Sequence, residues 1–159
     1  MSENLRVILV PRYGATQKFD WYSWLEEKLR AKNKFPLGEW VFCDLLPKPE
    51  SPEPSRCNSH LSSILGTNAS QLKNTLIIAH SLGAQIALRT LAEMEEEQAI
   101  AGLICVAGWL SLDHPPTSLA SRIDVEFDQK AATAKTKSAK NNYQLDLAHG
   151  EYNKGYIDR

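Results

Sequence analysis

Ser81 stands where a strand pattern changes directly into a helix pattern, a position from which a serine hydroxyl can act as a nucleophile. The apolar run at 76–79 predicts a short buried strand, and apolar residues at helical spacing begin at Leu82. A serine on so sharp a turn is typical of a nucleophile elbow. Gly83 fits the elbow pattern, whereas Ala79 replaces the glycine commonly found two positions before the serine. The alternative is a serine that caps the helix of an ordinary strand–helix unit.

A nucleophilic serine needs a base to accept its proton and a carboxylate to orient that base. His149 is our candidate base because it follows the last predicted strand, at 142–147, near the end of the chain. His80 is next to the serine, and neighbours on a sharp turn point apart, so we expect it to be structural. His60 falls in a polar helix, and His114 precedes two prolines in a loop without further support.

The orienting carboxylate should lie between the serine and the base in the chain, at the end of another strand. The aspartates in that interval are Asp113, Asp124, Asp128 and Asp146. Asp124 follows a weak strand pattern at 117–121 and is the predicted acid. Asp128 and Asp113 remain alternatives, whereas Asp146 lies inside the last predicted strand and would not reach the site from a strand end.

Backbone N–H groups from two segments are expected to hold the oxyanion that forms when a carbonyl is attacked. The helix that begins at Leu82 directs free N–H groups toward that position. The β-branched run at 5–10 predicts a central buried strand, and the loop after it would lie at the ligand-binding edge of an α/β sheet. We therefore expect the second N–H to come from Arg12 or Tyr13, with a plain turn as the alternative.

Strand and helix patterns alternate along the chain. The predicted strands are 5–10, 39–43, 76–79, 100–107 and 142–147, with a weaker one at 117–121. One helix is predicted after Asp20, which resembles an N-cap, and others are predicted at 58–65, 82–93 and 127–140. This alternation predicts an α/β fold, a three-layer sandwich with a mostly parallel, doubly wound sheet, in which residues 1–159 form one domain.

Two further segments have a structural interpretation and a functional alternative. The apolar stripe of Trp21, Trp24 and Leu25 should pack against the sheet, although Trp21 or Tyr22 could instead line a pocket. Four prolines within 44–54 argue against a helix or a central strand there. They predict a rigid loop, and the alternative is a polyproline segment that binds a protein partner.

Composition argues against several classes of function. The formal net charge of -1 gives no electrostatic basis for binding nucleic acid or an anionic membrane. No apolar run has the length of a membrane span, and the apolar part of the N-terminal segment is too short for a signal peptide. The three cysteines lack metal-ligand spacing, so we expect reduced thiols in a cytoplasmic protein.

Five motifs occur in an order that points to a known family. They are V-P-R-Y-G-A at 10–15, W-Y-S-W-L at 21–25, L-P-K-P at 46–49, I-A-H-S-L-G-A-Q-I-A-L-R at 78–89 and G-L-I-C-V-A-G-W at 102–109. Together they resemble the small α/β-hydrolases typified by retinoblastoma-binding protein nine and its bacterial relatives. The resemblance implies a compact serine hydrolase that needs no metal or cofactor. It matches Ser81 to the nucleophile, Asp124 to the acid and His149 to the base.

The second half of the chain departs from that family pattern. The segment between Gly108 and Ala120 is shorter than usual, Val125 replaces a proline after the acid, and no final helix precedes Arg159. We expect a hydrolase of small esters or amides. The alternative is a catalytically impaired relative that acts as a binding or scaffold protein. A protein partner or a dimer at an open sheet edge is compatible with either, and the sequence does not define the substrate.

Overall fold

A parallel β-sheet forms the centre of the molecule. The computed structural model describes residues 4–31, 36–108 and 135. Within these residues the sheet has four parallel strands in the order β2-β1-β3-β4. Their bounds are β1 Leu5–Val10, β2 Leu37–Phe42, β3 Thr75–His80 and β4 Gly102–Val106. The predicted α/β fold with a parallel sheet is confirmed.

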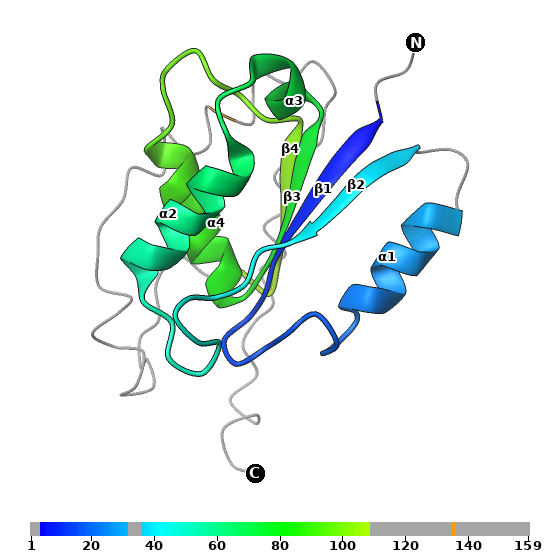
Figure 1. The fold of residues 1–159 in the computed structure, drawn as a ribbon, viewed down its shortest axis with the longest axis vertical. Helices are drawn as coiled ribbons and strands as arrows, with labels where there is room; N and C mark the ends of the chain where they lie inside the picture. The colour runs from blue at the N-terminus through cyan, green and yellow to red at the C-terminus, as the bar shows by residue number, and fades with distance from the viewer. Residues whose placement is uncertain (1–3, 32–35, 109–134, 136–159) are drawn as a thin grey trace.

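Helices cover both faces of this sheet (Figure 1). Their bounds are α1 Tyr22–Ala31, α2 Pro54–Leu65, α3 Ala69–Lys73 and α4 Leu82–Ala92. Helix α1 lies on one face, and α2 and α4 lie together on the other. This is the three-layer, doubly wound arrangement that alternating strands and helices predict.

The chain reverses its direction across the sheet between β1 and β3. It leaves β1 through α1 to reach β2 at one edge, and it then returns through α2 to place β3 on the other side of β1. The carboxyl ends of β1 and β3 therefore meet at a topological switch point, where ligands bind in open α/β sheets. The register pairs Val10 with Ala79, so the two strands end side by side.

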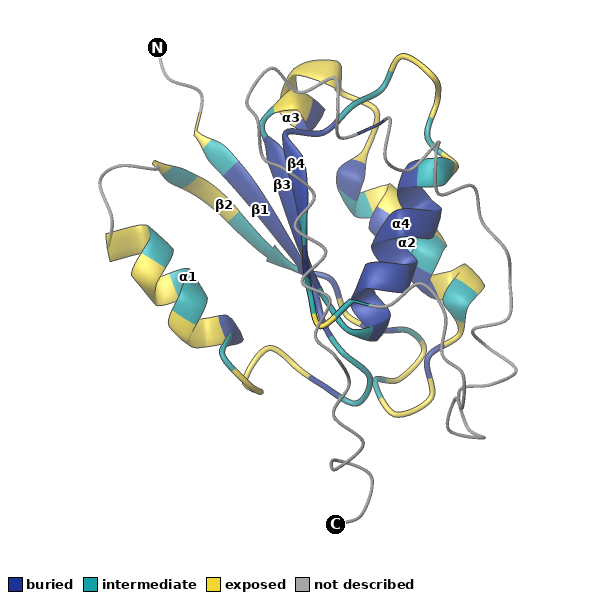
Figure 2. Ribbon diagram, turned by 180° about the vertical axis from the view of Figure 1, so that it is seen from behind, coloured by how far each residue is buried: buried dark blue, intermediate teal, exposed yellow. Residues whose placement is uncertain are grey.

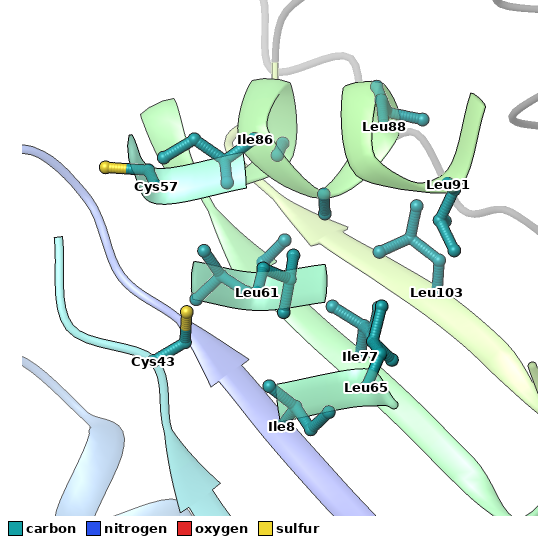
Figure 3. Packing of buried hydrophobic residues seen from close by; sticks show 14 of the residues in the cluster. Ile8, Cys43, Cys57, Leu61, Leu65, Ile77, Ile86, Leu88, Leu91 and Leu103 are labelled. Atoms are coloured by element: carbon teal, nitrogen blue, oxygen red, sulfur yellow. The ribbon is translucent and has the colours of Figure 1, made fainter. Parts of the chain in front are cut away.

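The larger part of the hydrophobic core lies between the sheet and the helices α2 and α4 (Figures 2 and 3). It includes Ile8 and Ile77 from the sheet, Leu61 from α2 and Leu91 from α4, all fully buried. The face under α1 has two small clusters, centred on Val7 and on Leu9. The packing that fixes the sheet is therefore concentrated on the α2–α4 side.

Two helices differ from the sequence prediction at their first residues. Helix α2 begins at Pro54, four residues before the predicted start, since proline at the first position lacks an N–H that would have no helical partner. Helix α3 was not predicted. The side chain of Asn68 accepts hydrogen bonds from the amides of Ser70 and Gln71 and so begins this short helix.

Two residues near α1 correct other predictions. Asp20 does not cap the helix, which begins at Tyr22; its carboxylate pairs with Arg12 at 2.7 Å instead. Trp24 does not pack in the core, and 58% of its surface is exposed. Tyr22 is the aromatic residue of α1 that is completely buried.

Several predictions lie outside the described residues. They concern the strands at 117–121 and 142–147, the helix at 127–140 except for Lys135, and the single domain over 1–159. The helical residue Lys135 is buried, and its ammonium group donates a hydrogen bond to the Glu95 carbonyl at 2.6 Å. In the parts of the chain that the structure describes, no helix is long and apolar enough to cross a membrane.

Candidate active site

Ser81 forms the whole connection between β3 and α4. The strand ends at His80 and the helix begins at Leu82. The backbone of Ser81 has φ 51° and ψ −114°, a conformation that residues other than glycine rarely adopt. Its hydroxyl makes no capping hydrogen bond to the helix. The elbow geometry is present, and the alternative of an ordinary capping serine does not fit.

Gly83 is required by the close approach of the helix to the end of β1. A Cβ atom added at this glycine would lie 2.2 Å from the carbonyl oxygen of Val10 and 2.8 Å from that of Pro11. No side chain can be accommodated against backbone atoms at these distances. The glycine two positions after the serine therefore lets α4 start directly beside the loop that follows β1.

The elbow is also fixed on its other side, by the end of β4. The Ser81 N–H donates a hydrogen bond to the Val106 carbonyl at 2.9 Å, and the Ser81 carbonyl accepts one from Ala84 at 2.9 Å. The first amides of a helix have no carbonyl partner within the helix. The N–H of Leu82 is one of these, so it can stabilise negative charge next to the serine.

The loop after β1 is held by hydrogen bonds from two of its backbone amides and from one side chain. The Arg12 N–H donates to the hydroxyl of Tyr22 at 3.1 Å. The Gly14 N–H donates to the Pro49 carbonyl at 2.8 Å, and the Tyr13 hydroxyl donates to the carbonyl of Glu50. The proline-rich loop is thus attached to the predicted oxyanion loop.

The Arg12 side chain braces the same loop from outside. Its Nε and a terminal nitrogen contact the two carboxylate oxygens of Asp20 at 2.7 and 3.2 Å. Its other terminal nitrogen donates to the Tyr13 carbonyl at 2.9 Å. Asp20 itself has φ 52°, a left-handed conformation that aspartate tolerates better than most residues.

His80 is connected to the oxyanion loop by the Tyr22 hydroxyl, which contacts both. The Tyr22 hydroxyl lies 2.9 Å from His80 Nδ1. Burial raises the pKa of Tyr22 to about 12, so its hydroxyl keeps its proton at neutral pH. Burial also lowers the pKa of His80 below its ordinary value. The contact agrees with the structural role that was expected for His80.

The structure brings together one part of the predicted site. Ser81 and Leu82 lie at the carboxyl end of β3, beside the end of β1, from which Arg12 and Tyr13 follow. The remaining predicted residues lie outside the described part of the chain: His149, Asp124, Asp128, Asp113 and His114. Over the ranges 4–31 and 36–108, no three His, Cys, Asp or Glu side chains form a group that could hold a metal ion.

Ser81 is not among the residues that line the hollow next to His60, and the cysteines are inaccessible. His60 lines a hollow of about 390 Å³ beside α2, together with Leu46 and Arg56. The three cysteines are free and buried, as expected, and burial raises the pKa of Cys43 to about 12 and that of Cys105 to about 11. These thiols therefore remain protonated and unreactive at neutral pH.

Sequence reasoning did not identify Tyr22 and His80 as partners of the oxyanion loop. The sequence suggests Tyr22 only as a possible pocket residue and His80 as a structural neighbour of the serine. The pairing depends on the relative placement of α1 and β3, which are 58 positions apart at this contact. No local pattern could have revealed it.

Comparisons with known proteins agree with this geometry. A family model described as serine hydrolase matches residues 7–152. "Putative hydrolase YdeN" of Bacillus subtilis is 28% identical over 104 residues, which are 65% of this chain and 50% of that protein. The chain therefore spans about half the length of this curated relative.

A solved structure extends the similarity to the fold. The crystal structure of the ydeN gene product from B. subtilis matches with a TM-score of 0.69 and 26% identity, covering 84% of this chain and 68% of that one. The match of the family model to most of the sequence, together with the elbow at Ser81, shows that the chain belongs to the serine hydrolase family.

Proposed function

We propose that this protein hydrolyses small esters or amides with Ser81 as the nucleophile. One observation carries the proposal: Ser81 sits between strand and helix in a left-handed conformation, with its hydroxyl unused for capping. A strained backbone at such a turn is typical of functional sites. Membership of the serine hydrolase family supports the same reaction.

The proposed reaction follows the acyl-transfer sequence. His149 accepts the proton of the Ser81 hydroxyl as the oxygen attacks the carbonyl carbon, and the N–H of Leu82 stabilises the oxyanion. The imidazolium then gives its proton to the leaving alcohol or amine, and the acyl group remains on the serine. Water attacks this acyl-enzyme with the same base and releases the acid. Asp124 orients the imidazole throughout.

The proposal also covers cofactors, the place within the family and the cellular compartment. The triad requires no metal or cofactor, and the motif order supports a place near retinoblastoma-binding protein nine within the family. Asp128 and Asp113 are the alternative acids. Three buried free thiols suit a reducing compartment, and we place the protein in the cytoplasm on that basis.

The test is turnover of a panel of p-nitrophenyl esters by purified protein and its variants. Replacing Ser81 or His149 with alanine should lower kcat by about 10³-fold or more, since triad members act as a unit. Among Asp124→Asn, Asp128→Asn and Asp113→Asn, only the first should give a comparable loss. Ser59→Ala, at an exposed serine of α2, is the matched control and should retain activity.

Two outcomes would contradict the proposal. Undiminished turnover by Ser81→Ala would exclude the serine as nucleophile. Absence of turnover across the panel, with a correctly folded wild type, would favour the impaired binding or scaffold protein instead.

A further inference from the structure

We propose that Tyr22, held by His80, is a positioning residue for the oxyanion hole. Its hydroxyl occupies the Arg12 N–H and leaves the Tyr13 N–H as the second donor to the oxyanion, beside that of Leu82. The inference rests on the proposed hydrolase function and deepens it. Of the Arg12 and Tyr13 amides, both of which the sequence leaves open as donors, that of Tyr13 is selected.

The amides on both sides of Tyr13 are already used. The Arg12 N–H donates to the Tyr22 hydroxyl at 3.1 Å, and the Gly14 N–H donates to the Pro49 carbonyl at 2.8 Å. A donor that is bound to a protein acceptor is not available to a developing oxyanion without first losing that bond. The Tyr13 N–H is the amide between them.

The peptide that carries the Tyr13 N–H has a fixed orientation. Its carbonyl, that of Arg12, accepts a hydrogen bond from the Ala15 N–H at 3.2 Å. In a trans peptide the N–H points opposite to the carbonyl, so the Tyr13 N–H is directed away from Ala15. This loop begins next to the first turn of α4, because a Cβ added at Gly83 would touch the Pro11 carbonyl.

The Tyr22 hydroxyl makes more than one hydrogen bond. Its oxygen accepts from the Arg12 N–H at 3.1 Å and lies 2.9 Å from His80 Nδ1, and it also interacts with the Asp20 carboxylate. The charged groups that act on this pair are Asp20 and Arg12, which pair with each other.

The surroundings of Tyr22 keep this hydroxyl in place. The side chain is fully buried, and its ring packs edge-on against Trp21 with centroids 4.9 Å apart and against Phe42 at 5.9 Å. His80 directly precedes Ser81 in the chain. A single hydroxyl therefore links the oxyanion loop to the strand end that carries the nucleophile.

The test compares Tyr22→Phe with wild type in the rate at which a fluorophosphonate probe phosphonylates the serine, with release of fluoride, and in turnover of p-nitrophenyl acetate. The probe rate and kcat should each fall by about 10- to 100-fold, less than the loss of a whole oxyanion donor, with KM nearly unchanged. His80→Phe, which removes the hydrogen-bond partner of Tyr22 and leaves its hydroxyl in place, should show a smaller fall. The double variant should be no slower than Tyr22→Phe, because His80 acts through Tyr22.

Thr75→Val is the matched control for lost stability. It removes a buried hydroxyl that donates to the Gln71 carbonyl at 2.8 Å, at the opposite end of β3. Its probe rate should equal that of wild type. Circular dichroism at the assay temperature establishes that each variant is folded, and His80→Phe serves as the test if Tyr22→Phe is not.

An NMR measurement distinguishes positioning from a general structural effect. When phenylboronic acid forms its tetrahedral adduct with the wild type, the Tyr13 amide resonance should shift strongly and the Arg12 amide resonance should not. An adduct that shifts Arg12 instead, or equal probe rates for wild type, Tyr22→Phe and His80→Phe, would overturn the inference. A wild type that neither reacts with the probe nor turns over the ester would contradict the proposed function itself.

Discussion

The two faces of the sheet are built in different ways, and the candidate site joins them. Among the described residues, the face under α2 and α4 has one continuous buried cluster, whereas the face under α1 has two small ones. Figure 2 shows that α4 is mostly buried and α1 mostly exposed. The serine elbow belongs to the first face and is fixed by close packing at Gly83. The oxyanion loop leads to the second and is fixed by polar contacts of Arg12 and Tyr22. Dense packing thus places the nucleophile, and hydrogen bonds place its partner.

The largest effect should come from Gly83→Ala, which disrupts the close packing of α4 against the end of β1. The added Cβ would lie 2.2 Å from the Val10 carbonyl oxygen, a backbone atom that cannot turn away. We expect the free energy of unfolding to fall by about 4 kcal/mol, at the upper end for single substitutions. Urea denaturation followed by circular dichroism measures this change.

Gly66→Ala is the control for that substitution. Gly66 has a positive φ, 67°, whereas Gly83 is helical, and a Cβ at Gly66 would meet nothing within 4 Å. Only the strain of a backbone conformation that is essentially restricted to glycine, φ 67° with ψ −167°, should remain, at about 2 kcal/mol. Equal losses for the two variants would show that the contact with β1 is not what requires glycine at position 83.

Truncation of one leucine on each face compares the two packing layers directly. Leu61→Ala removes a completely buried side chain of α2 and should cost about 3 kcal/mol of unfolding free energy. Leu25→Ala, in α1, removes a partly buried side chain and should cost about 1 kcal/mol. Denaturant midpoints at constant m-value give both numbers, and a larger loss for Leu25→Ala would reverse the comparison.

The polar side should respond to pH through His80. Burial lowers the pKa of this imidazole in the folded protein below its ordinary 6.5, so the unfolded chain binds more protons between the two values. The stabilisation that comes from keeping His80 neutral is therefore fully present above pH 6.5. It is lost as the pH falls from 6.5 through the folded pKa. Thermal unfolding between pH 7.5 and 5 should show this fall, and His80→Phe should reduce it. An unchanged pH profile in the variant would exclude His80 as its source.

The smallest effect is expected at Trp24. Although this residue lies on α1, 58% of its surface is exposed, so little apolar area is lost to water on its replacement. Trp24→Ser should change the unfolding free energy by about 0.5 kcal/mol or less. A loss above about 2 kcal/mol in the same denaturation assay would show that Trp24 contributes to the core after all.

The strands and the elbow were predictable because their signals are local. The run 76–79 is apolar throughout and the run 5–10 is apolar except for Arg6, as expected for strands buried on both faces, and the structure has strands there. Ser81 and Gly83 together predicted the elbow. The structure shows why glycine is needed, because a Cβ at position 83 would collide with the Val10 carbonyl. The helix after Ser81 was predicted within about one residue of its end.

The contacts of the oxyanion loop were not predictable because they depend on tertiary placement. An aromatic stripe at helical spacing suggested that Trp24 would be buried, yet α1 buries Tyr22 and exposes the tryptophan. Asp20 has the type and position of an N-cap, but a salt bridge to Arg12 uses its carboxylate. Polar side chains have several possible partners of similar energy, and the fold decides between them.

The central claim is that Ser81 is the reactive nucleophile, and chemical labelling tests it most directly. Folded wild-type protein is treated with a fluorophosphonate, digested, and examined by mass spectrometry, with Ser81→Ala treated in parallel. One covalent adduct is expected on the peptide that contains Ser81 in the wild type, and none in the variant. An unlabelled Ser81 peptide in folded wild type, or the same labelling in Ser81→Ala, would contradict it.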